Sequence, residues 1–376
     1  MPHTSNIFPL GIIVSSDDVV DREQFIQETK LRLFHGNSVM LSGPRRIGKS
    51  SVAREIIRRL NNDGCYVAQV DLFYITNEEE LALKILQSVL QNRTGVFPYI
   101  AQTLKQWRDV LSRADFHAKV SDLELGLTLA PQTHLLNLLE TAILTAEKLA
   151  IKDGRRMVNL LDEFQELDRL GGQPLLKRLR SLFQQQENTT YFFLGSESSL
   201  LQTIFADRRQ AFYRFATLLE LPPVPDPAWR AYLVNKLADS GVSVTDSALS
   251  LLLERTGGHP YCVMAVMANA FLYTRMTQSK QVDAEVLDFA YEQALTQLDA
   301  VYEEQWQDIR RFKGADALFA SIVQNKPLYS RQASFNVTRS VQSLLRLSVV
   351  EKGDERGKYH LIEPMFGDWF RRKTMR

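Results

Sequence analysis

The stretch that decides the fold is Ser38-Val39-Met40-Leu41-Ser42 followed by Gly43-Pro44-Arg45-Arg46-Ile47-Gly48-Lys49-Ser50. The first part is a short apolar run, typical of a buried strand. The second part fits the pattern G-x-x-x-x-G-K-[ST], and apolar residues at helical spacing follow it from Val52 to Leu60. A glycine-containing turn between a strand and a helix presents successive backbone N–H groups, and the helix N-terminus adds positive potential. The stretch therefore predicts a phosphate-binding loop in an α/β sheet.

The residue types within this loop have separate physical roles. Gly48 has no Cβ, so the main chain can approach a phosphate closely. Lys49 would reach the β- and γ-phosphate oxygens as a point charge, and the Ser50 hydroxyl would hold Mg²⁺. Arg45 and Arg46 either touch phosphate or remain solvated, which is the commoner fate of such side chains. We therefore expect ATP or ADP with Mg²⁺, surrounded by Gly43, Pro44, Arg45, Arg46, Ile47, Gly48, Lys49, Ser50 and Ser51.

Two carboxylates end another apolar run. Residues 157–161 are followed by Asp162 and Glu163. At the carboxyl end of a parallel strand, Asp162 would lie beside the loop and bind Mg²⁺ through water. Glu163 would polarise the attacking water as a catalytic residue. Alternatively, Glu163 caps the next helix, because carboxylates are common in a first turn.

The separation of Lys49 from Asp162 also carries information. It leaves room for an extra strand between the two nucleotide-binding strands, and the run at residues 66–72 supplies one. A further run lies at residues 191–194, and residues 120–129 nearly alternate, which predicts a β-ribbon or edge strand. The pattern favours the ASCE type of P-loop protein, with a catalytic Glu beside the metal-binding Asp. No guanine-reading N-K-x-D motif is present.

Two further residues are candidates for the same chemistry. Ser196 follows the run at residues 191–194 and would sense the γ-phosphate or position the water, or simply cap a helix. Arg214 would act as an arginine finger, either in its own subunit or in a neighbouring one. A surface or salt-bridged role accounts for Arg214 equally well.

The composition bounds the class of protein. The chain has 376 residues, 45% of them hydrophobic and 24% charged, with a formal net charge of +1. These values are typical of a folded protein of two or three domains, and they exclude nucleic-acid binding by bulk charge. Cys65 and Cys262 have no CxxC or Cys/His partner, so neither a disulfide framework nor a zinc site is expected. No apolar run approaches the roughly 18 residues of a membrane span, so we expect a cytoplasmic protein without membrane contact.

Periodicity and proline content divide the chain into three predicted domains. A proline cluster marks a boundary near residue 222, and residues 229–307 have a helical pattern throughout. Helical runs at residues 315–324 and 337–347 are followed by a hairpin pattern at residues 349–362, as in a winged helix-turn-helix. We therefore predict a P-loop ATPase domain at 1–222, an α-helical lid at 223–308 and a winged helix at 309–376.

Taken together, the motifs resemble a known family. The chain is similar to the archaeal-type P-loop ATPases, an AAA+/STAND-like family also found in bacteria. Asp21 stands where the family has Gly, and Glu363 where it has Asp; these departures bear on adenine contact and domain docking. The matching segments run in the family's order along nearly the whole chain: residues 6–11 with 20–23, 43–50, 161–165, 194–197, 213–214, 257–261 and 361–369.

The resemblance implies an ATP-dependent switch. An ASCE-type sheet would bind Mg-ATP, a helical lid would report the phosphate state, and a C-terminal winged helix would relay the change. By the same resemblance, the N-terminal box with Phe8, Gly11 and Arg22 would border the adenine. His259 and Pro260 would approach the nucleotide from the lid, unless they are an ordinary buried histidine and a first-turn proline.

The sequence is consistent with three functions. The leading one is a slow ATPase switch that engages an unknown protein partner. The alternative is a DNA-associated regulator, of the loader or transposition-targeting type, that uses ATP for homo-oligomeric assembly. The third is a scaffold that holds ADP permanently. Four cations of the predicted winged helix favour DNA contact: Arg339, Arg346, Arg356 and Lys358. Two acidic residues, Asp354 and Glu355, count against it.

Overall fold

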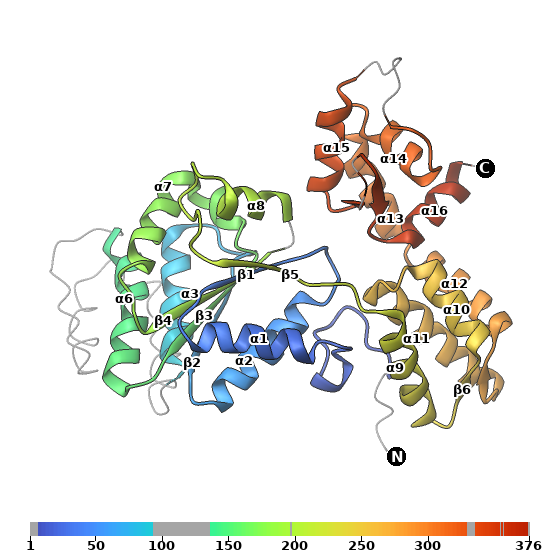
Figure 1. Cartoon of the computed structure of the whole chain (residues 1–376), viewed down its shortest axis with the longest axis horizontal. Coiled ribbons are helices and arrows are strands. Elements are labelled where there is room, and N and C mark those ends of the chain that lie inside the picture. The colour runs from blue at the N-terminus through green and yellow to red at the C-terminus, as the bar shows by residue number, and fades with distance from the viewer. Residues whose placement is uncertain are drawn as a thin grey trace.

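A parallel sheet organises the first half of the computed structural model, which describes residues 7–92, 136–195, 198–328, 335–353, 355 and 357–374. Its strands pair in the order β2-β3-β4-β1-β5, all in parallel (Figure 1). The α/β class is thereby confirmed. The alternating residues 120–129 and Ser196 lie outside the described residues. The strands are β1 (Val39–Ser42), β2 (Tyr66–Asp71), β3 (Met157–Asp162), β4 (Thr189–Leu194) and β5 (Thr217–Glu220).

The strand that lies between β1 and β3 is β4, and not the run at residues 66–72. Leu41 of β1 is opposite Leu194 of β4, and β4 also pairs with β3, whereas β2 lies at the sheet edge. An extra strand does lie between the two nucleotide-binding strands, but the prediction that residues 66–72 form it is wrong. All six residues of β4 are buried, whereas in β2 only Ala68 and Val70 are, and a central strand must bury both faces.

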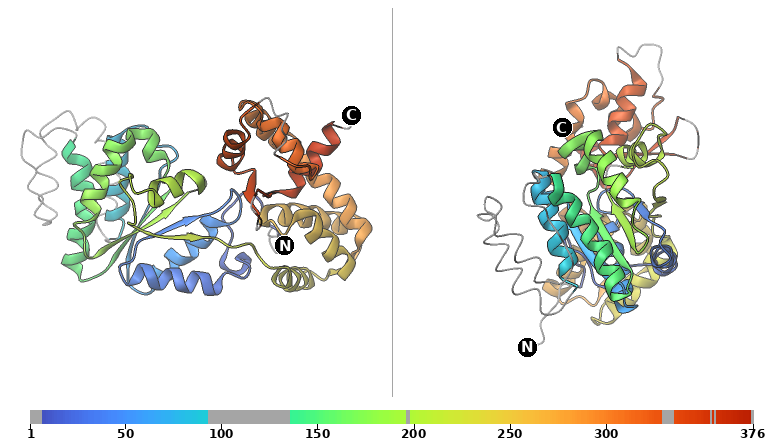
Figure 2. Two further views of the ribbon diagram at one scale, coloured as in Figure 1. Left: turned by 45° about the horizontal axis from the view of Figure 1, so that its top comes forward. Right: turned by 90° about the vertical axis from the view of Figure 1, so that its left-hand side faces the viewer.

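Helices cover both faces of this sheet, as Figure 2 shows in two further views. Alternate strand residues point to opposite faces. Leu41 and Phe192 pack with α1 and α2, whereas Met40 and Phe193 pack with α3, α6, α7 and α8. The helices are α1 (Glu23–Phe34), α2 (Lys49–Asn62), α3 (Glu78–Leu90), α6 (Leu136–Asp153), α7 (Glu166–Phe183) and α8 (Ser198–Ala206).

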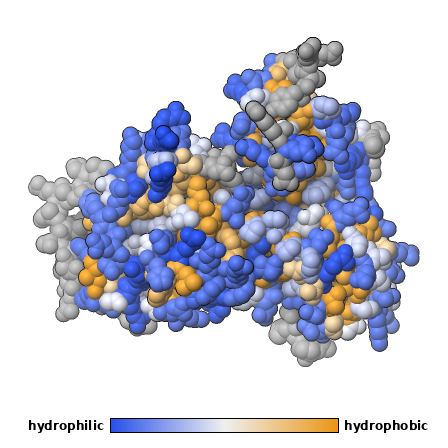
Figure 3. Space-filling model, viewed as in Figure 1, coloured by the Kyte–Doolittle hydropathy of each residue, from blue (hydrophilic) through white to orange (hydrophobic). Residues whose placement is uncertain are grey.

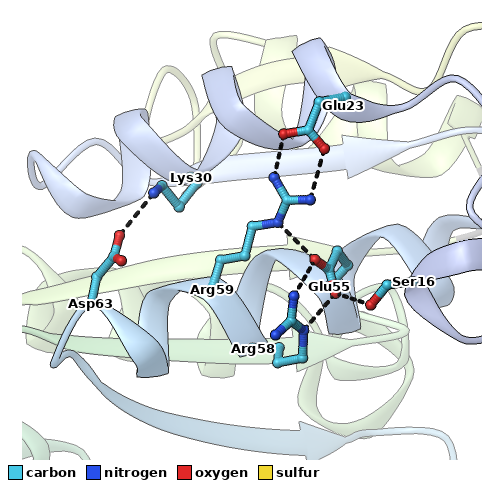
Figure 4. A network of polar contacts seen from close by, with 7 residues as sticks. All are labelled: Ser16, Glu23, Lys30, Glu55, Arg58, Arg59 and Asp63. Carbon is cyan, nitrogen blue, oxygen red and sulfur yellow. Dashed lines mark hydrogen bonds and ion pairs between the residues drawn. The ribbon is translucent and has the colours of Figure 1, made fainter.

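An ion-pair network joins α1 to α2 (Figure 4). Arg59 of α2 donates two hydrogen bonds to Glu23 of α1, at 2.5 and 2.7 Å, and one to Glu55 at 2.7 Å. Glu55 also accepts from Arg58 and Ser16. The Arg58 hydrogen bond is the main reason that the pKa of Glu55 falls to about 2. The network thus links α1 to α2, whose N-terminus follows the loop.

The chain after Leu221 is mainly helical. The expectation of helix throughout is wrong at one place, because β6 (Ser243–Val244) and β7 (Gln281–Val282) pair in parallel. The residues that follow these strands, Thr245 and Asp283, cap helices with extended backbone, which suits a strand end. The helices are α9 (Asp226–Ala238), α10 (Asp246–Thr256), α11 (Pro260–Thr277), α12 (Ala284–Gln297) and α13 (Asp299–Arg310).

The final elements follow the predicted order of two helices and a hairpin. In the hairpin, Val350 lies opposite Leu361 in antiparallel pairing, and α15 contacts α8 of the sheet region. The winged-helix assignment itself stays a prediction. The elements are α14 (Ala315–Val323), α15 (Val337–Arg346), β8 (Val350–Lys352), β9 (Tyr359–Leu361) and α16 (Pro364–Thr374).

Within the described ranges, none of the helices has the length and apolar character to span a bilayer. Figure 3 shows apolar side chains in patches between hydrophilic ones on the face viewed. The large apolar side chains that are exposed belong to several different elements, among them Phe73, Leu218 and Met276. Scattered exposure of this kind is normal for a folded protein and needs no special explanation.

Candidate active site

The loop between β1 and α2 has the backbone that a phosphate-binding turn requires. Gly48 precedes α2 with φ of +102°, a region that L side chains rarely adopt. A Cβ placed on Gly48 would meet no atom within 4 Å, so conformation rather than crowding demands glycine here. Arg46 also has a positive φ, of +63°. The first N–H groups of an α-helix have no partner within the helix, so those at the start of α2 can bind an anion.

Lys49 is the buried cation of this loop, with 8% of its surface exposed. Its Nζ donates hydrogen bonds to the carbonyl oxygens of Gly43 and Pro44, both at 2.7 Å. Burial lowers the pKa of Lys49 to about 8, although the carboxylates of Glu163 and Asp162 act in the opposite direction. An ammonium group held by neutral carbonyls can exchange them for charged phosphate oxygens, which form stronger hydrogen bonds.

The acidic pair lies at the carboxyl end of β3. Asp162 is the last residue of the strand, in register with Asp71 of β2. Glu163 follows with φ of +53°, and its N–H donates to Oδ1 of Asp162 at 2.9 Å. Burial raises the pKa of Asp162 to about 6, and the charge of Glu163 adds to the rise. A nearby cation would relieve this repulsion.

A cavity of about 720 Å³ brings the loop and the acidic pair together. Its volume lies within the range of small-molecule and cofactor pockets. The loop and β3 supply polar groups, whereas Val20, Val224, Trp229 and Met264 supply apolar ones, which suits a ligand with a charged tail and a flat ring. The predicted site residues that line it are Gly11, Arg22, Arg45, Arg46, Ile47, Gly48, Lys49, Ser50, Ser51, Asp162, Glu163 and Pro260.

Arg22 lines the cavity as a nearly buried cation, with 3% of its surface exposed. Its Nη1 donates to the carbonyl oxygen of Pro223 at 3.3 Å, and no protein atom in the described ranges accepts from its Nη2. Burial lowers the pKa of Arg22. A buried guanidinium with an unused donor at a cavity wall is suited to a ligand acceptor.

Four predicted residues lie off the cavity wall but near it or beneath it. Gly43 and Pro44 contribute the carbonyls that hold Lys49. Phe8 is fully buried and belongs to the same core as α11, so it anchors the N-terminal segment. His259 is 4% exposed, and burial lowers its pKa against the influence of Glu363 and the Arg45 backbone.

Arg214 lies apart from its own subunit's cavity. It has a positive φ of +56°, its N–H donates to the Phe205 carbonyl at 3.1 Å, and its guanidinium lies 5.2 Å from the Tyr213 ring centroid. The side chain is exposed. The structure therefore does not bring Arg214 together with Lys49 and Glu163.

Sequence reasoning missed many side chains of the cavity, among them Tyr261, Trp229 and Gln165. The Tyr261 ring lies 4.5 Å from the Arg46 guanidinium, and Trp229 donates from Nε1 to the Gly258 carbonyl at 2.9 Å. Gln165, 2% exposed, contacts Glu163. Adjacency to Pro260 is the signal that could have pointed to Tyr261. Trp229 carries no such signal, because a buried tryptophan in a helix is usually part of a core.

The donor set fits Mg²⁺ bound together with a nucleotide. No group of three or more His, Cys, Asp or Glu side chains that could hold a metal occurs in the part of the chain that the structure describes. Mg²⁺ typically uses one or two carboxylates together with substrate phosphates and water. Asp162 and Ser50 both line the cavity and would provide such ligands.

Solved structures share this fold. PABY2304, a Walker-type ATPase of Pyrococcus abyssi, aligns with a TM-score of 0.70 and 18% identity over 97% of this chain and 99% of that chain. The ORC2 protein of Aeropyrum pernix, in ADPNP–ADP complexes, aligns with a TM-score of 0.56 and 13% identity over 99% of this chain and 98% of that chain. The ORC1 protein of the same organism, in complex with DNA, aligns with a TM-score of 0.50 and 15% identity over 98% of this chain and 96% of that chain.

Sequence comparison gives a complementary result. No curated protein matches the chain significantly. Residues 19–265 match the model of an ATPase domain predominantly from Archaea, so the match includes the loop, the acidic pair and the Gly257–Gly258 turn. The matched segment exceeds half of the 376 residues. This protein is therefore a member of that family of archaeal-type ATPases.

Proposed function

We propose that the protein is an ATP-hydrolysing switch whose nucleotide state repositions a helical lid and a winged helix to engage a partner. One observation carries the proposal: Lys49, Asp162 and Glu163 line a single cavity although more than a hundred residues separate the lysine from the acids. A buried ammonium, a carboxylate that would hold Mg²⁺ and a second carboxylate that would orient water are groups that phosphoryl transfer to water uses.

The protein's own groups have distinct tasks in this proposal. The N–H groups at the start of α2 and the Lys49 ammonium bind the phosphates, and Ser50 and Asp162 hold the metal. Bound Mg²⁺ supplies charge neutralisation on the phosphate oxygens. Glu163 orients the attacking water by accepting its hydrogen bond. These contacts together position the reactants, which is the main source of catalysis in this reaction class.

The switch depends on contacts between the loop and the helices after residue 222. Arg46 of the loop stacks on Tyr261 of α11, and Arg22 donates to Pro223 at the predicted boundary between the domains. Pro260 and Tyr261 both line the cavity. A change in the phosphates bound by the loop thus acts directly on α11. This favours the assignment of residues 223–308 as a lid and of residues 309–376 as the part that the lid moves.

The alternative function is a DNA-associated regulator that assembles as a homo-oligomer. The exposed position of Arg214, away from its own cavity, favours this alternative, because an arginine placed in this way can complete a neighbour's site. The likeness to an ORC1 protein in complex with DNA adds weight to it. A cytoplasmic location stays a prediction from the sequence.

Two substitutions test the ATPase switch. We expect Lys49→Ala to abolish ATP binding measured by calorimetry, and Glu163→Gln to retain binding but stall phosphate release. Lys148→Ala and Glu254→Gln, at exposed positions of α6 and α10, serve as matched controls. Continued turnover in both site variants would refute the mechanism. ADP that stays bound through purification and never exchanges would favour the scaffold function instead.

A mixing experiment tests the alternative. Arg214→Ala protein combined with Glu163→Gln protein recovers activity if Arg214 acts in a neighbouring subunit, because some sites then hold one intact copy of each group. Arg209→Ala, at an exposed arginine paired with Asp207, is the control. A gel-shift titration at increasing salt measures DNA contact, and an affinity that does not change with salt removes phosphate contact from consideration.

A further inference from the structure

We propose that Gln165 is a positioning residue for Glu163: its side-chain amide holds the carboxylate in the orientation that activates water. The inference rests on the proposed function of Glu163. The contact that carries it is a hydrogen bond from Nε2 of Gln165 to Oε2 of Glu163. Gln165 is 2% exposed and lines the same cavity as Glu163. A buried donor therefore lies directly behind the catalytic carboxylate.

The local backbone indicates that this contact is not a helix cap. Gln165 occupies the N-cap position of α7, where a polar side chain usually accepts a hydrogen bond from the first turn. Its side chain makes no such bond and points back to Glu163 instead. Glu163 itself has φ of +53°, in the left-handed region, which is costly for a residue with a Cβ. The turn is thus shaped to bring the two side chains together.

The end of β4 makes room for the amide. A Cβ on Gly195 would lie 2.4 Å from Oε1 of Gln165 and 2.5 Å from Leu201, closer than real Cβ contacts allow. The Phe164 N–H donates to the Leu194 carbonyl at 2.9 Å, which fixes the turn against the same strand end. Oε1 of Gln165 has no hydrogen-bond partner within the described ranges, so Nε2 and its contact with Glu163 account for the placement of this amide.

The chemistry of the donor matters for catalysis. A neutral amide N–H fixes the orientation of a carboxylate without giving it a proton and without neutralising its charge. The neighbouring cation, Lys49, attracts the Glu163 carboxylate and must instead serve the phosphates. Without Gln165, Glu163 can turn toward Lys49 and away from the water. A misplacement of this kind is expected to slow turnover by roughly 10- to 100-fold.

The decisive variant is Gln165→Met, which keeps the length and the buried packing of the side chain but removes the N–H donor. We expect kcat for ATP hydrolysis to fall about 10- to 100-fold while the calorimetric Kd for Mg-ATP stays within about twofold of wild type. Gln165→Glu has the same shape but an acceptor in place of the N–H donor, so we expect the same fall in kcat and the same unchanged Kd. The control is Gln185→Met, at an exposed position of the same chain region.

A double variant separates positioning from general stability. If Gln165 acts through Glu163, adding Gln165→Met to Glu163→Gln produces no further loss of kcat. The proposal is overturned if Gln165→Met hydrolyses ATP like wild type, if its Kd rises in proportion to the loss of kcat, or if the two losses multiply. A different result, normal turnover in Glu163→Gln alone, would contradict the proposed function of Glu163 rather than the contact with Gln165.

Discussion

Tyr302 of α13 donates a hydrogen bond from its hydroxyl to Oε2 of Glu363 at 3.2 Å, in the interior of the protein. Cys262 of α11 contacts the same oxygen through its sulfur at 3.9 Å. Glu363 directly precedes α16. One buried carboxylate thereby connects the helix that follows the Gly257–Gly258 turn with the last helix of the chain. Burial raises the pKa of Tyr302, so its hydroxyl remains a donor at neutral pH.

Replacing Tyr302 by Phe tests the importance of this contact. The ring packing is retained, but Oε2 of Glu363 loses its hydroxyl donor while remaining buried. We expect the free energy of unfolding to fall by about 1–3 kcal/mol, because this buried carboxylate oxygen then has the weak Cys262 contact in place of a hydroxyl donor. Urea denaturation followed by tryptophan fluorescence measures the change.

Tyr74→Phe is the matched control, because Tyr74 is 74% exposed. The same chemical change at that surface position is expected to alter the unfolding free energy by less than about 0.5 kcal/mol. Equal losses in the two variants would show that the hydroxyl of Tyr302 has no special role in the interior.

A second prediction concerns the packing of the Gly257 turn against α16. Gly257 has φ of +58°, and a Cβ there would lie 2.9 Å from Cγ of Pro364. Gly64 also has a positive φ, of +88°, but a Cβ there meets no atom within 4 Å. Gly64→Ala is expected to cost about 1–2 kcal/mol of unfolding free energy from backbone strain alone. Gly257→Ala is expected to cost about 1–3 kcal/mol more.

Denaturant unfolding of both alanine variants provides the measurement. The backbone strain of an alanine at positive φ is similar in the two variants. The difference between their unfolding free energies therefore measures the clash between the turn and Pro364. Gly257→Ala that is no less stable than Gly64→Ala would mean that α16 moves aside freely. In that case the Gly257 turn and the C-terminal elements are not rigidly packed at this point.

The sequence predicts the loop and its fold well for a physical reason. Phosphate binding by main-chain N–H groups demands a local arrangement of glycines, lysine and hydroxyl, so the pattern at residues 43–50 carries both structure and chemistry. Sequence analysis misses β5 (Thr217–Glu220), because the strand has only four residues, two of them exposed, and Thr-Leu-Leu-Glu does not alternate between apolar and polar residues. The placement of β4 between β1 and β3 also depends on burial of both its faces, which comes from packing and not from its own residues alone.

Sequence reasoning misses cavity residues whose position depends on packing and that no motif marks. Trp229 lines the cavity only because α9 packs beside the Gly258 carbonyl. The role of Gln165 depends on the space left at Gly195, thirty residues later in the chain. His259 is a different case: the family resemblance implies nucleotide contact or an ordinary buried histidine, the structure buries the side chain off the cavity wall, and the contact stays a prediction. Such relationships are properties of the folded chain and not of local spacing.

Acid titration of Glu55 gives a third prediction. Its pKa is lowered from 4.5 to about 2, mainly by the hydrogen bond from Arg58. A carboxylate with a depressed pKa in the folded state stabilises the protein above the unfolded pKa, and this contribution disappears as the pH falls through the folded pKa. We therefore expect the unfolding free energy of wild type to fall between pH 4.5 and about 2 more steeply than that of Glu55→Gln. Parallel curves would contradict the depressed pKa.

The pH dependence of ATP affinity provides the last prediction. Burial lowers the pKa of Lys49 to about 8, so the free protein loses this charge above that pH. Bound phosphates favour the ammonium form, and ATP binding above pH 8 must therefore take up a proton. We expect the Kd for ATP to rise with pH above this value, by up to about tenfold per unit.

Calorimetry in buffers of different ionisation enthalpy counts the protons taken up, and Lys49→Arg provides the comparison because arginine stays charged throughout this range. The variant is expected to bind ATP more weakly, since its larger head group cannot occupy the space between the Gly43 and Pro44 carbonyls, but with an affinity that is independent of pH. Wild-type protein that binds ATP at one pH unit above the Lys49 pKa with no proton uptake would show that Lys49 is already fully charged before the nucleotide arrives.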